Sequence, residues 1–503
     1  MRIKVECASI TEVACDLLIV NLFEGVKHPG GATGAVDQAL GGLIKELIGA
    51  QEIDGKLGKA PVIHTQGKLP AKRVAVVGLG KGSDFNLDKV REASAAAISA
   101  AKKVKAKKVV TIVHGAGVGG LDTKAATQAL VEGSLLQEYK FEGYITKREE
   151  AEHKIDELLI VDYVPKKIKE IEEGVRIGEV IADSVNKARD LVNAPGNKVT
   201  PSELAKYAEA LAKEAKLKCE IIDIADAKKM GMEALYSVAK GSEEPAKVIV
   251  LEYSGLPAGR QGGGKEKIGL VGKGITFDAG GVSLKPSKKL AEMKDDMAGA
   301  ATVIETMRAI SKLGVKKNVI AVIPATENMP DGGALKPGDI IGSLSGMTIE
   351  ILSTDAEGRM VIADAITYAK KLGATKLIDV ATLTGGCITS LGDVASGIMG
   401  NDQKLIDQIK EAGGQVGEKM WQFPLYEEYK EYLKSDLADI KNCMEDSMAS
   451  PPTGGIFIQK FVENTPWAHI DIAGTAYLHK GRGYLSEGAT GVGVRTLVYL
   501  LQS

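Results

Sequence analysis

The sequence contains few cysteines and few aromatic residues, and its net charge is close to zero. Its 503 residues include only five scattered cysteines, without a CxxC pair, and 4% aromatic residues. This usage argues against a disulfide framework and against a structural zinc knot, so a reducing cytoplasm is the expected setting. The formal charge of -2 gives no global field that would favour nucleic acid or an anionic membrane as a partner.

Long apolar runs are also missing. No window approaches the roughly 20 apolar residues that a membrane helix needs. The segment 1–16 carries acids inside its apolar stretch, so we expect neither a signal peptide nor an anchor there. Glycine, in contrast, is abundant at 59 residues, which is typical of α/β proteins with many tight turns. The length exceeds one ordinary core, so two or three domains are expected.

Three segments can be distinguished along the chain. Short β-rich runs alternate with alanine-rich helical stretches over residues 1–164, which predicts a small α/β domain with a mostly parallel sheet. Charged sequence with apolar residues at helix spacing predicts a connecting helix over 165–189. Thr200 begins a predicted capping box, and βα alternation resumes over 190–503, which predicts a larger α/β domain. Its buried strands are predicted at 247–253, 268–272, 318–323 and 376–382.

Two glycine-rich stretches receive no chemical role from the sequence. Residues 115–120, GAGVGG, follow a predicted strand and formally match the GxGxxG pattern of dinucleotide-binding proteins. An ordinary glycine turn is favoured, because no helix start follows and no acidic residue ends a second strand at the required distance. Residues 259–267 are expected to form a surface loop.

Charged residues recur in 353–360, STDAEGRM, between an apolar strand and an apolar helix. Asp355, Glu357 and Arg359 stand at every second position, so an extended backbone would point all three side chains the same way. Buried charges are costly unless they are paired or bound to metal. We therefore expect this segment to meet compensating groups from elsewhere in the chain.

Upstream segments supply such groups. Lys273 and Asp278 lie just past a predicted strand, where open α/β sheets keep their ligands. Asp296 precedes a predicted amphipathic helix, where a carboxylate could also serve only to complement the helix dipole. If the strand-end loops of one sheet bring these groups to one edge with Asp355 and Glu357, the oxygen-rich cluster favours divalent metals.

Other catalytic classes find little support. The six histidines show no HExxH or other paired spacing and are expected to be surface or packed residues; they are His28, His64, His114, His153, His469 and His479. No GxSxG is present, no cysteine sits in a convincing Cys/His setting, and no Walker GxxxxGK[ST] supports phosphate chemistry.

Taken together, the chemistry-bearing segments resemble the leucyl aminopeptidases, also called the cytosol aminopeptidase family. The family signature is usually written NTDAEGR followed by leucine, and here it reads STDAEGRM. Supporting motifs are GKGITFDAGG at 272–281, MKDDM at 293–297, ENMP at 327–330, DVATLTGG at 379–386 and WAHIDIAGT at 467–475. The resemblance implies a small macro-like α/β domain followed by a larger catalytic α/β domain with a mixed, largely parallel central sheet.

The resemblance also implies a site with two divalent ions, zinc or manganese, with cobalt or magnesium as alternatives. The expected ligands are Lys273, Asp278, Asp296, Asp355 and Glu357, and Asp278 and Glu357 are expected to touch both ions. Lys273 would have to be neutral, which the field of two adjacent dications would favour.

The remaining site residues implied by the resemblance are not ligands. Lys285 is expected to stabilise a developing oxyanion, and Arg359 is expected to hold a bicarbonate ion that serves as the general base. Positions that line the pocket for the N-terminal side chain or contact the substrate backbone match Met293, Thr382, Leu383 and Gly385.

Some positions depart from the family pattern. Ser353, Met360 and Ala279 replace residues that are usually asparagine, leucine, and serine or threonine, and none of the three is an expected ligand. The segment 442–460 replaces a glycine- and alanine-rich run that helps to shape the substrate pocket, so side-chain preference stays open.

The resemblance implies a cytoplasmic hydrolase that removes leucine and other, mainly apolar, residues from the N-termini of peptides. It also implies a homohexamer of two stacked trimers, while a membrane or nucleic-acid partner is not indicated. The residues alone leave two alternatives open. One is a divalent-metal phosphohydrolase that uses the same carboxylates. The other is a catalytically silent scaffold or nucleic-acid-binding module that acts through the N-terminal domain.

Overall fold

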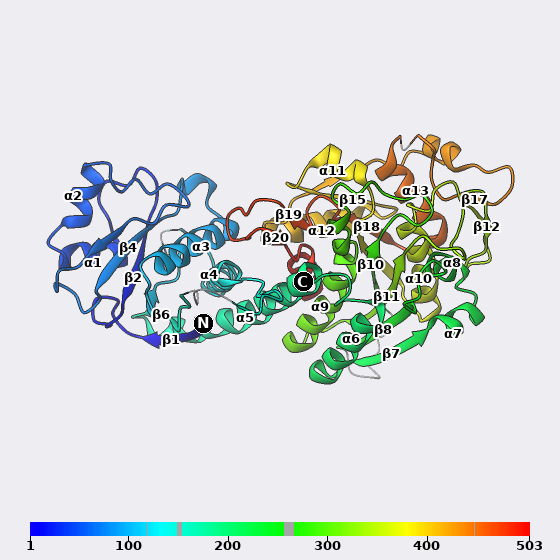
Figure 1. The fold of residues 1–503 in the computed structure, drawn as a ribbon. Coiled ribbons are helices and arrows are strands. Elements are labelled where there is room, and N and C mark those ends of the chain that lie inside the picture. The colour runs from blue at the N-terminus through cyan, green and yellow to red at the C-terminus, as the bar shows by residue number, and fades with distance from the viewer. Residues whose placement is uncertain (118, 148–152, 256–265, 447) are drawn as a thin grey trace. The chain divides into compact units, whose positions relative to one another are not determined.

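The structure is a computed structural model that describes residues 1–117, 119–147, 153–255, 266–446 and 448–503. The chain divides into two compact units, one made of residues 1–183 and 480–487 and the other of 184–479 and 488–503 (Figure 1). All but the last two residues of the predicted loop 259–267 lie outside the described residues. In the described ranges, no helix combines the length and the apolar character needed to span a bilayer.

The first unit is built on a six-stranded sheet of order β1-β6-β5-β2-β4-β3. Its strand pairs are parallel except for the edge pair β3 and β4. The strands are β1 Arg2–Cys7, β2 Leu17–Leu22, β3 Val62–His64, β4 Arg73–Gly78, β5 Lys108–Thr111 and β6 Glu157–Asp162. The helices are α1 Gly31–Ala39, α2 Leu43–Gly49, α3 Leu87–Lys103 and α4 Thr123–Glu138, with a 3-10 helix η1 at Gly82–Asp84.

Helices cover both faces of this sheet because successive strand residues point to opposite sides. In β2, Leu17 and Ile19 join a buried cluster with α3 and α4, whereas Leu18 and Val20 join a second cluster with α1 and α2. A strand buried on both faces reads as a continuous apolar run, which is why it could be predicted from the sequence.

Helix α5 (Pro165–Asn193) covers the segment expected to connect the domains, and the division between the units falls within it, after Asp183. The following helix, α6 (Pro201–Ala215), begins at the predicted N-cap residue and shows one of the two hydrogen bonds of a capping box. Thr200 Oγ1 accepts a hydrogen bond from Glu203 N at 3.3 Å, and Pro201 occupies the first helical position, where its missing N–H costs nothing.

The second unit contains a nine-stranded sheet of order β16-β15-β18-β14-β9-β11-β8-β7, with β10 paired to β11. The strands are β7 Lys218–Asp223, β8 Lys247–Ser254, β9 Lys267–Gly272, β10 Gly274–Asp278, β11 Asn318–Asn328, β14 Lys376–Ala381, β15 Ser396–Gly400, β16 Met420–Gln422 and β18 Trp467–Asp471. Pairing is antiparallel at β7/β8, β8/β11 and β15/β18 and parallel elsewhere. The prediction of a mixed, largely parallel sheet is therefore confirmed.

Smaller elements and helices complete the second unit. Two short sheets contain β12 Ile340–Ile341, β13 Ile349–Glu350 and β17 Ile440–Lys441, and β19 Tyr477–Leu478 with β20 Gly488–Ala489. The remaining helices are α7 Ile224–Lys229, α8 Glu233–Ala239, α9 Ala298–Leu313, α10 Gly358–Lys371, α11 Gly385–Leu391, α12 Gln403–Val416, α13 Ser450–Val462 and α14 Val494–Gln502, with 3-10 helices η2 Leu290–Asp295 and η3 Glu427–Leu433.

The central strands lie between α9 and α10. Val271 of β9 belongs to the buried cluster that contains the apolar face of α10. The next residue, Gly272, faces α9 so closely that a Cβ there would lie 2.6 Å from Gly299 O. Because α9 and α10 both begin near the carboxyl ends of these strands, their first turns meet the loops that carry the predicted site residues.

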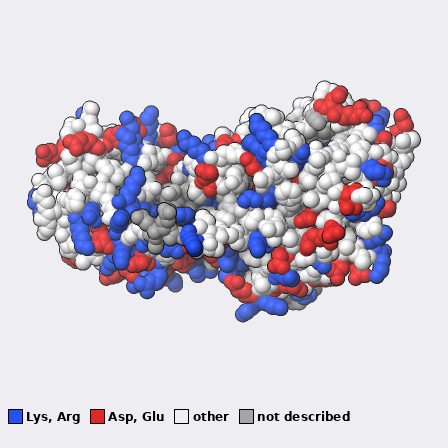
Figure 2. Space-filling view, viewed as in Figure 1, with Lys and Arg blue, Asp and Glu red and all other residues white. Residues whose placement is uncertain are grey.

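Charged side chains of both signs occupy the exposed surface. On the face drawn in Figure 2, Lys and Arg stand beside Asp and Glu over each unit, and the two signs are interspersed. This agrees with the formal charge of -2 for the whole chain.

Candidate metal centre

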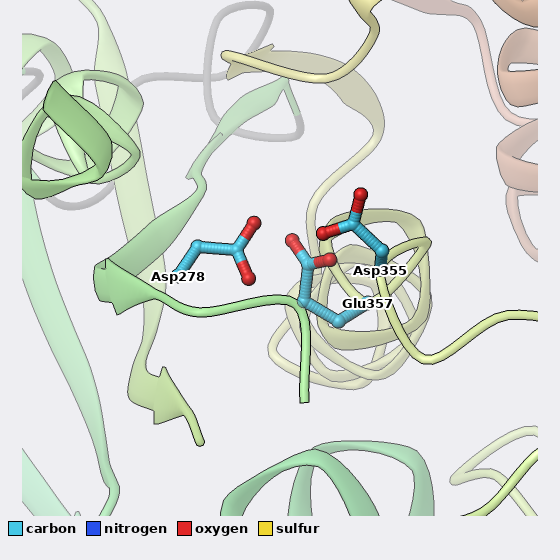
Figure 3. Close-up of side chains that lie close together, drawn as sticks. All are labelled: Asp278, Asp355 and Glu357. Atoms are coloured by element: carbon cyan, nitrogen blue, oxygen red, sulfur yellow. The ribbon is translucent and has the colours of Figure 1, made fainter. Parts of the chain in front are cut away.

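The predicted charged residues lie close together, although they come from separate elements. Lys273 follows β9, Asp278 ends β10, and Asp296 lies between η2 and α9. Asp355 and Glu357 lie in the turn before α10. One oxygen of each of Asp278, Asp355 and Glu357 lies within 4.8 Å of the others, and the three carboxylates point toward a common space in Figure 3.

The backbone of residues 353–359 is not extended, which was the condition for all three charged side chains to point the same way. Residues 354 and 355 form a turn, Glu357 has helical backbone angles (φ -75, ψ -36), and Arg359 already belongs to α10. Asp355 and Glu357 nevertheless meet, because the turn reverses the chain before the helix begins.

Lys273 lies at the buried side of the cluster. Its Nζ is 2.8 Å from both oxygens of Asp296, 2.9 Å from Glu357 Oε1 and 3.0 Å from the carbonyl oxygen of Thr382. Its side chain also packs on Gly358, where a Cβ would come within 2.5 Å of Lys273 Cε. A glycine at the start of α10 therefore admits the lysine to the cluster.

Lys285 lies at the more open side of the cluster, with its side chain 22% exposed. Its Nζ is 2.9 Å from Asp278 Oδ2 and 2.5 Å from Asp355 Oδ1. The loop after β10 returns Lys285 to this position, and Lys285 N donates to Ala279 O at 2.9 Å. Gly280 and Gly281 make this reversal with φ of +89 and +63, which other residues rarely adopt.

Burial and mutual repulsion shift the titration of the carboxylates. Burial, and then the charge of Asp278, raise the pKa of Glu357 to about 7, although Lys273 opposes this. Burial likewise raises the pKa of Asp355 and of Asp296. Burial alone would lower the pKa of Lys273, but the surrounding carboxylates more than offset this effect and its pKa lies above the usual value. Four carboxyl groups thus face two ammonium groups, so the fully ionised cluster carries more negative than positive charge.

Two buried oxygens of the cluster lack hydrogen bonds. Glu357 Oε2 accepts none, and neither does Asp296 Oδ2, although Lys273 Nζ lies 2.8 Å from it. A buried oxygen without a donor loses the solvation that it would have in water. Together with the net negative charge, these two atoms fit a divalent cation, because hard cations prefer oxygen ligands.

Arg359 is buried but does not contact the carboxylates. Its Nη1 donates to Asn442 O at 3.0 Å, and its Nε has no hydrogen-bond partner. Burial lowers its pKa. A buried guanidinium with an unused N–H group can accept an anion.

The predicted substrate-lining residues differ in how close they lie to the cluster. Thr382 Oγ1 donates to Asp296 Oδ1 at 2.8 Å, so Thr382 belongs to it directly. Gly385 begins α11, and Met293 lies half-buried in η2, three residues before Asp296. Leu383 borders the unusual segment 442–460, because a Cβ at Gly454 would lie 3.1 Å from Leu383 Cδ2.

Two positioning residues received no role from the sequence. Asn328 Nδ2 donates to Asp278 Oδ1 at 2.8 Å and to Thr354 O at 3.0 Å, which orients the carboxylate. Asp471 accepts hydrogen bonds from Leu383 N at 3.1 Å and from Thr384 Oγ1 at 2.7 Å, which fixes the loop after β14. Both residues lie in quoted motifs, ENMP and WAHIDIAGT, which were the available signal.

Comparison with known proteins gives full-length matches. Residues 186–498 match the model described as "Cytosol aminopeptidase family, catalytic domain", and residues 19–148 match the N-terminal domain of the same family. The "Probable cytosol aminopeptidase" of Alkaliphilus metalliredigens is 43% identical over 504 residues, covering 100% of this chain and 99% of the relative. The protein of the same name from Geotalea uraniireducens is 44% identical over 496 residues, covering 97% of each.

Solved structures give the same result. A mutant of tomato leucine aminopeptidase superposes with a TM-score of 0.86 at 30% identity, over 99% of this chain and 96% of that chain. The bottromycin maturation enzyme BotP in complex with Mn superposes with a TM-score of 0.84 at 31% identity, over 97% and 99% of the two chains.

Proposed function

Because the chain belongs to the cytosol aminopeptidase family, we propose that this metallo-aminopeptidase removes leucine and other, mainly apolar, residues from the N-termini of peptides. The observation that carries the proposal is the buried carboxylate cluster, in which Glu357 Oε2 and Asp296 Oδ2 accept no hydrogen bond. A cluster with more acids than lysines favours the binding of cations, and a peptidase without a serine or cysteine nucleophile requires an activated water.

Five residues would hold two divalent ions: Lys273, Asp278, Asp296, Asp355 and Glu357. When bound, such ions lower the pKa of a water molecule, orient the free amine of the peptide and polarise its carbonyl group. Lys273 would have to give up its proton to act as a ligand, which becomes favourable once other cations neutralise its carboxylate neighbours. Manganese in the BotP complex supports manganese alongside zinc as a candidate.

Lys285 and Arg359 would act without holding metal. Lys285 Nζ lies at the open side of the cluster, where an ammonium can stabilise the negative charge that develops on the peptide oxygen. The unused Nε of Arg359 would hold bicarbonate, which supplies the general base when bound. Thr382, Leu383, Gly385 and Met293 would position the N-terminal residue of the peptide.

We also propose a homohexamer of two stacked trimers in the cytoplasm. The names of the relatives, cytosol aminopeptidases, support the location. Light scattering coupled to size-exclusion chromatography would give the mass in solution, and a monomeric mass at working concentrations would contradict the assembly.

The function is tested with metal-depleted protein. We expect no hydrolysis of a leucine anilide after chelation, and recovery on addition of zinc, manganese or cobalt. Full activity with metal at background level would contradict the mechanism. Hydrolysis of a phosphate monoester instead of the anilide would favour the phosphohydrolase.

A pair of variants tests whether Lys285 acts in catalysis without being a metal ligand. Lys285→Ala should keep its metal but lose about 10²- to 10³-fold in kcat, the usual cost of removing one group that stabilises an oxyanion. Lys288→Ala, three positions away and exposed, is the matched control and should retain full activity. Loss of metal from Lys285→Ala would mean that the roles are misassigned.

A further inference from the structure

The first unit contains a cavity of about 510 Å³ that the peptidase chemistry does not use. All of its described lining residues belong to this unit. They lie at or just beyond the carboxyl ends of the parallel strands: residues 8–10 follow β1; 21, 23, 30–33 and 35 end or follow β2; 79 follows β4; 112, 113, 115–117 and 119 follow β5; and 161–164 and 167 end or follow β6. The cavity therefore opens along one edge of the sheet.

The sheet topology explains why a cavity forms there. Strands β2 and β5 are parallel neighbours in the sheet. From β2 the chain goes on to β3 and β4 on one side, whereas from β5 it goes on to β6 on the other side. Connections that leave two neighbouring strands in opposite directions open a crevice at their carboxyl ends, which is where open α/β sheets bind ligands.

The polar groups of the cavity favour an anion. Helix α1 starts there, with Gly30 as an N-cap that offers no side-chain acceptor and no acid in the first turn. Lys167 Nζ lies 3.4 Å from Ala116 O and makes no ion pair among the described residues. Asp162, the one carboxylate among the described lining residues, already accepts a hydrogen bond from Val164 N at 2.8 Å. Phosphate groups suit such a combination of helix N–H groups and an ammonium.

Most of the remaining lining is apolar or glycine backbone. Phe23 is held by Phe85 in an edge-to-face contact, with ring centroids 4.9 Å apart, and so presents a fixed aromatic surface. Ile10, Ile112 and Val161 also line the cavity. The volume lies within the ~300–1,000 Å³ of small-molecule sites, which are mostly apolar with a few polar groups.

We propose that the first unit binds a nucleoside diphosphate. The phosphates lie at the N-terminus of α1 and near Lys167, and the base lies against the apolar wall that includes Phe23. The GAGVGG segment does not open a helix as a dinucleotide fingerprint does, since α4 begins only at Thr123. Three of its glycines nevertheless line the cavity and let the ligand approach the backbone.

Calorimetric titration of ADP into the full chain tests the proposal. We expect one site per chain, with adenosine and inorganic phosphate each at least about tenfold weaker, since each keeps only part of the contacts. The titration is repeated after chelation, because diphosphates also bind divalent metal. The absence of binding up to millimolar ADP, or binding that disappears on chelation, would overturn the proposal.

Two matched pairs of variants locate the site. At Gly30 the backbone is extended (φ -119) and a Cβ would meet nothing within 4 Å, so Gly30→Leu should fold and narrow the cavity. Gly49→Leu, equally open but outside the lining, is its control. Lys167→Met is paired with Lys166→Met, which lies outside the lining. We expect Gly30→Leu and Lys167→Met to weaken ADP binding at least tenfold while the controls and the peptidase activity stay unchanged; equal affinity in all four variants would overturn the assignment.

Discussion

Buried charge is arranged differently in the two units. In the first, Arg91 of α3 and Glu132 of α4 form an almost fully buried ion pair, with Nε and Oε2 2.6 Å apart. Gln128 Nε2 donates to the other oxygen of Glu132 at 2.7 Å, so both carboxylate oxygens have donors. In the second unit, Glu357 and Asp296 are similarly buried, yet each keeps an oxygen without a hydrogen bond.

The difference separates a structural ion pair from a binding site. A complete set of partners lets a buried carboxylate join two helices, and nothing further is needed to neutralise it. An incomplete set, such as that of Glu357 Oε2, leaves an oxygen that a ligand can bind, and a raised carboxyl pKa accompanies it at Glu357. Variants in the two clusters should therefore fail in different ways.

The largest effect is expected for Glu357→Gln. It should lower kcat/KM by at least ~10³-fold and remove bound metal, since an amide is a weak ligand for hard cations. The metal-free variant should melt no lower than the metal-free parent, because it removes a charge that burial disfavours. Activity assays, metal analysis and thermal melts check the three parts, with the exposed Glu428→Gln as the control. A metal-free variant that is markedly less stable would mean that Glu357 also has a structural role.

Arg91→Met should have the opposite effect. We expect a loss of about 3–5 kcal/mol in the stability of the first unit, because Glu132 would be left buried without its cation. The double variant Arg91→Met/Glu132→Leu should recover most of that loss, since apolar residues of similar size replace the whole pair. Hydrogen exchange of α3 and α4 measures the stability of the single and of the double variant. A double variant as unstable as the single one would show that packing, and not charge, dominates at this site.

A third test uses His114 of the first unit, a buried residue whose imidazole is neutral in the folded protein. Burial lowers the pKa of His114 to about 4, from an ordinary value of 6.5, and Asn21 Nδ2 lies 3.1 Å from its Nδ1. Between these pH values the unfolded chain binds more protons than the folded one. The contribution of His114 to the free energy of unfolding is therefore fully present above pH 6.5. It falls by roughly 3 kcal/mol as the pH drops toward 4.

Hydrogen exchange of β2 and β5 across this pH range measures the loss. The variant His114→Gln should show a shallower pH dependence than the parent, since the difference between the two isolates the imidazole from all other titrating groups. Identical slopes would show that His114 is not buried in its neutral form.

The sequence predicted strands and site residues wherever the signal was local. β9 and β14 are continuous apolar runs because both faces of the sheet are covered. Lys273 directly follows β9 and Asp278 ends β10, so the sequence placed both residues near one edge of the central sheet. The turn before α10 follows β13 of a separate short sheet, so its approach to this edge could not be predicted from strand order. The backbone of 353–359 could not be predicted in the same way, because alternating charges fit a strand and a turn equally well.

The partners of the site residues depend on strand pairing over long distances. Asn328 meets Asp278 because β10 and β11 pair in parallel with these two residues opposite each other. Nothing in the sequence around either residue marks that register. Asp471 likewise reaches the loop at Leu383 only because β18 lies beside β14. The motifs that contain Asn328 and Asp471 mark them as candidates, but their partners can be identified only once the sheet is assembled.

The smallest effect is expected for Asn328→Ala, which tests whether such a partner matters. Removing a residue that orients a metal ligand usually costs about 10- to 100-fold in metal affinity or activity. Asp278 would lose one donor to Oδ1 while keeping that of Gly280 N at 2.9 Å, so a high metal concentration should restore the rate. Asn401→Ala is the control, because Asn401 bonds the backbone at Thr465 and Trp467 instead; it should lower stability without changing metal affinity. If excess metal fails to rescue Asn328→Ala, the asparagine holds the fold around the cluster and does not tune the ligand.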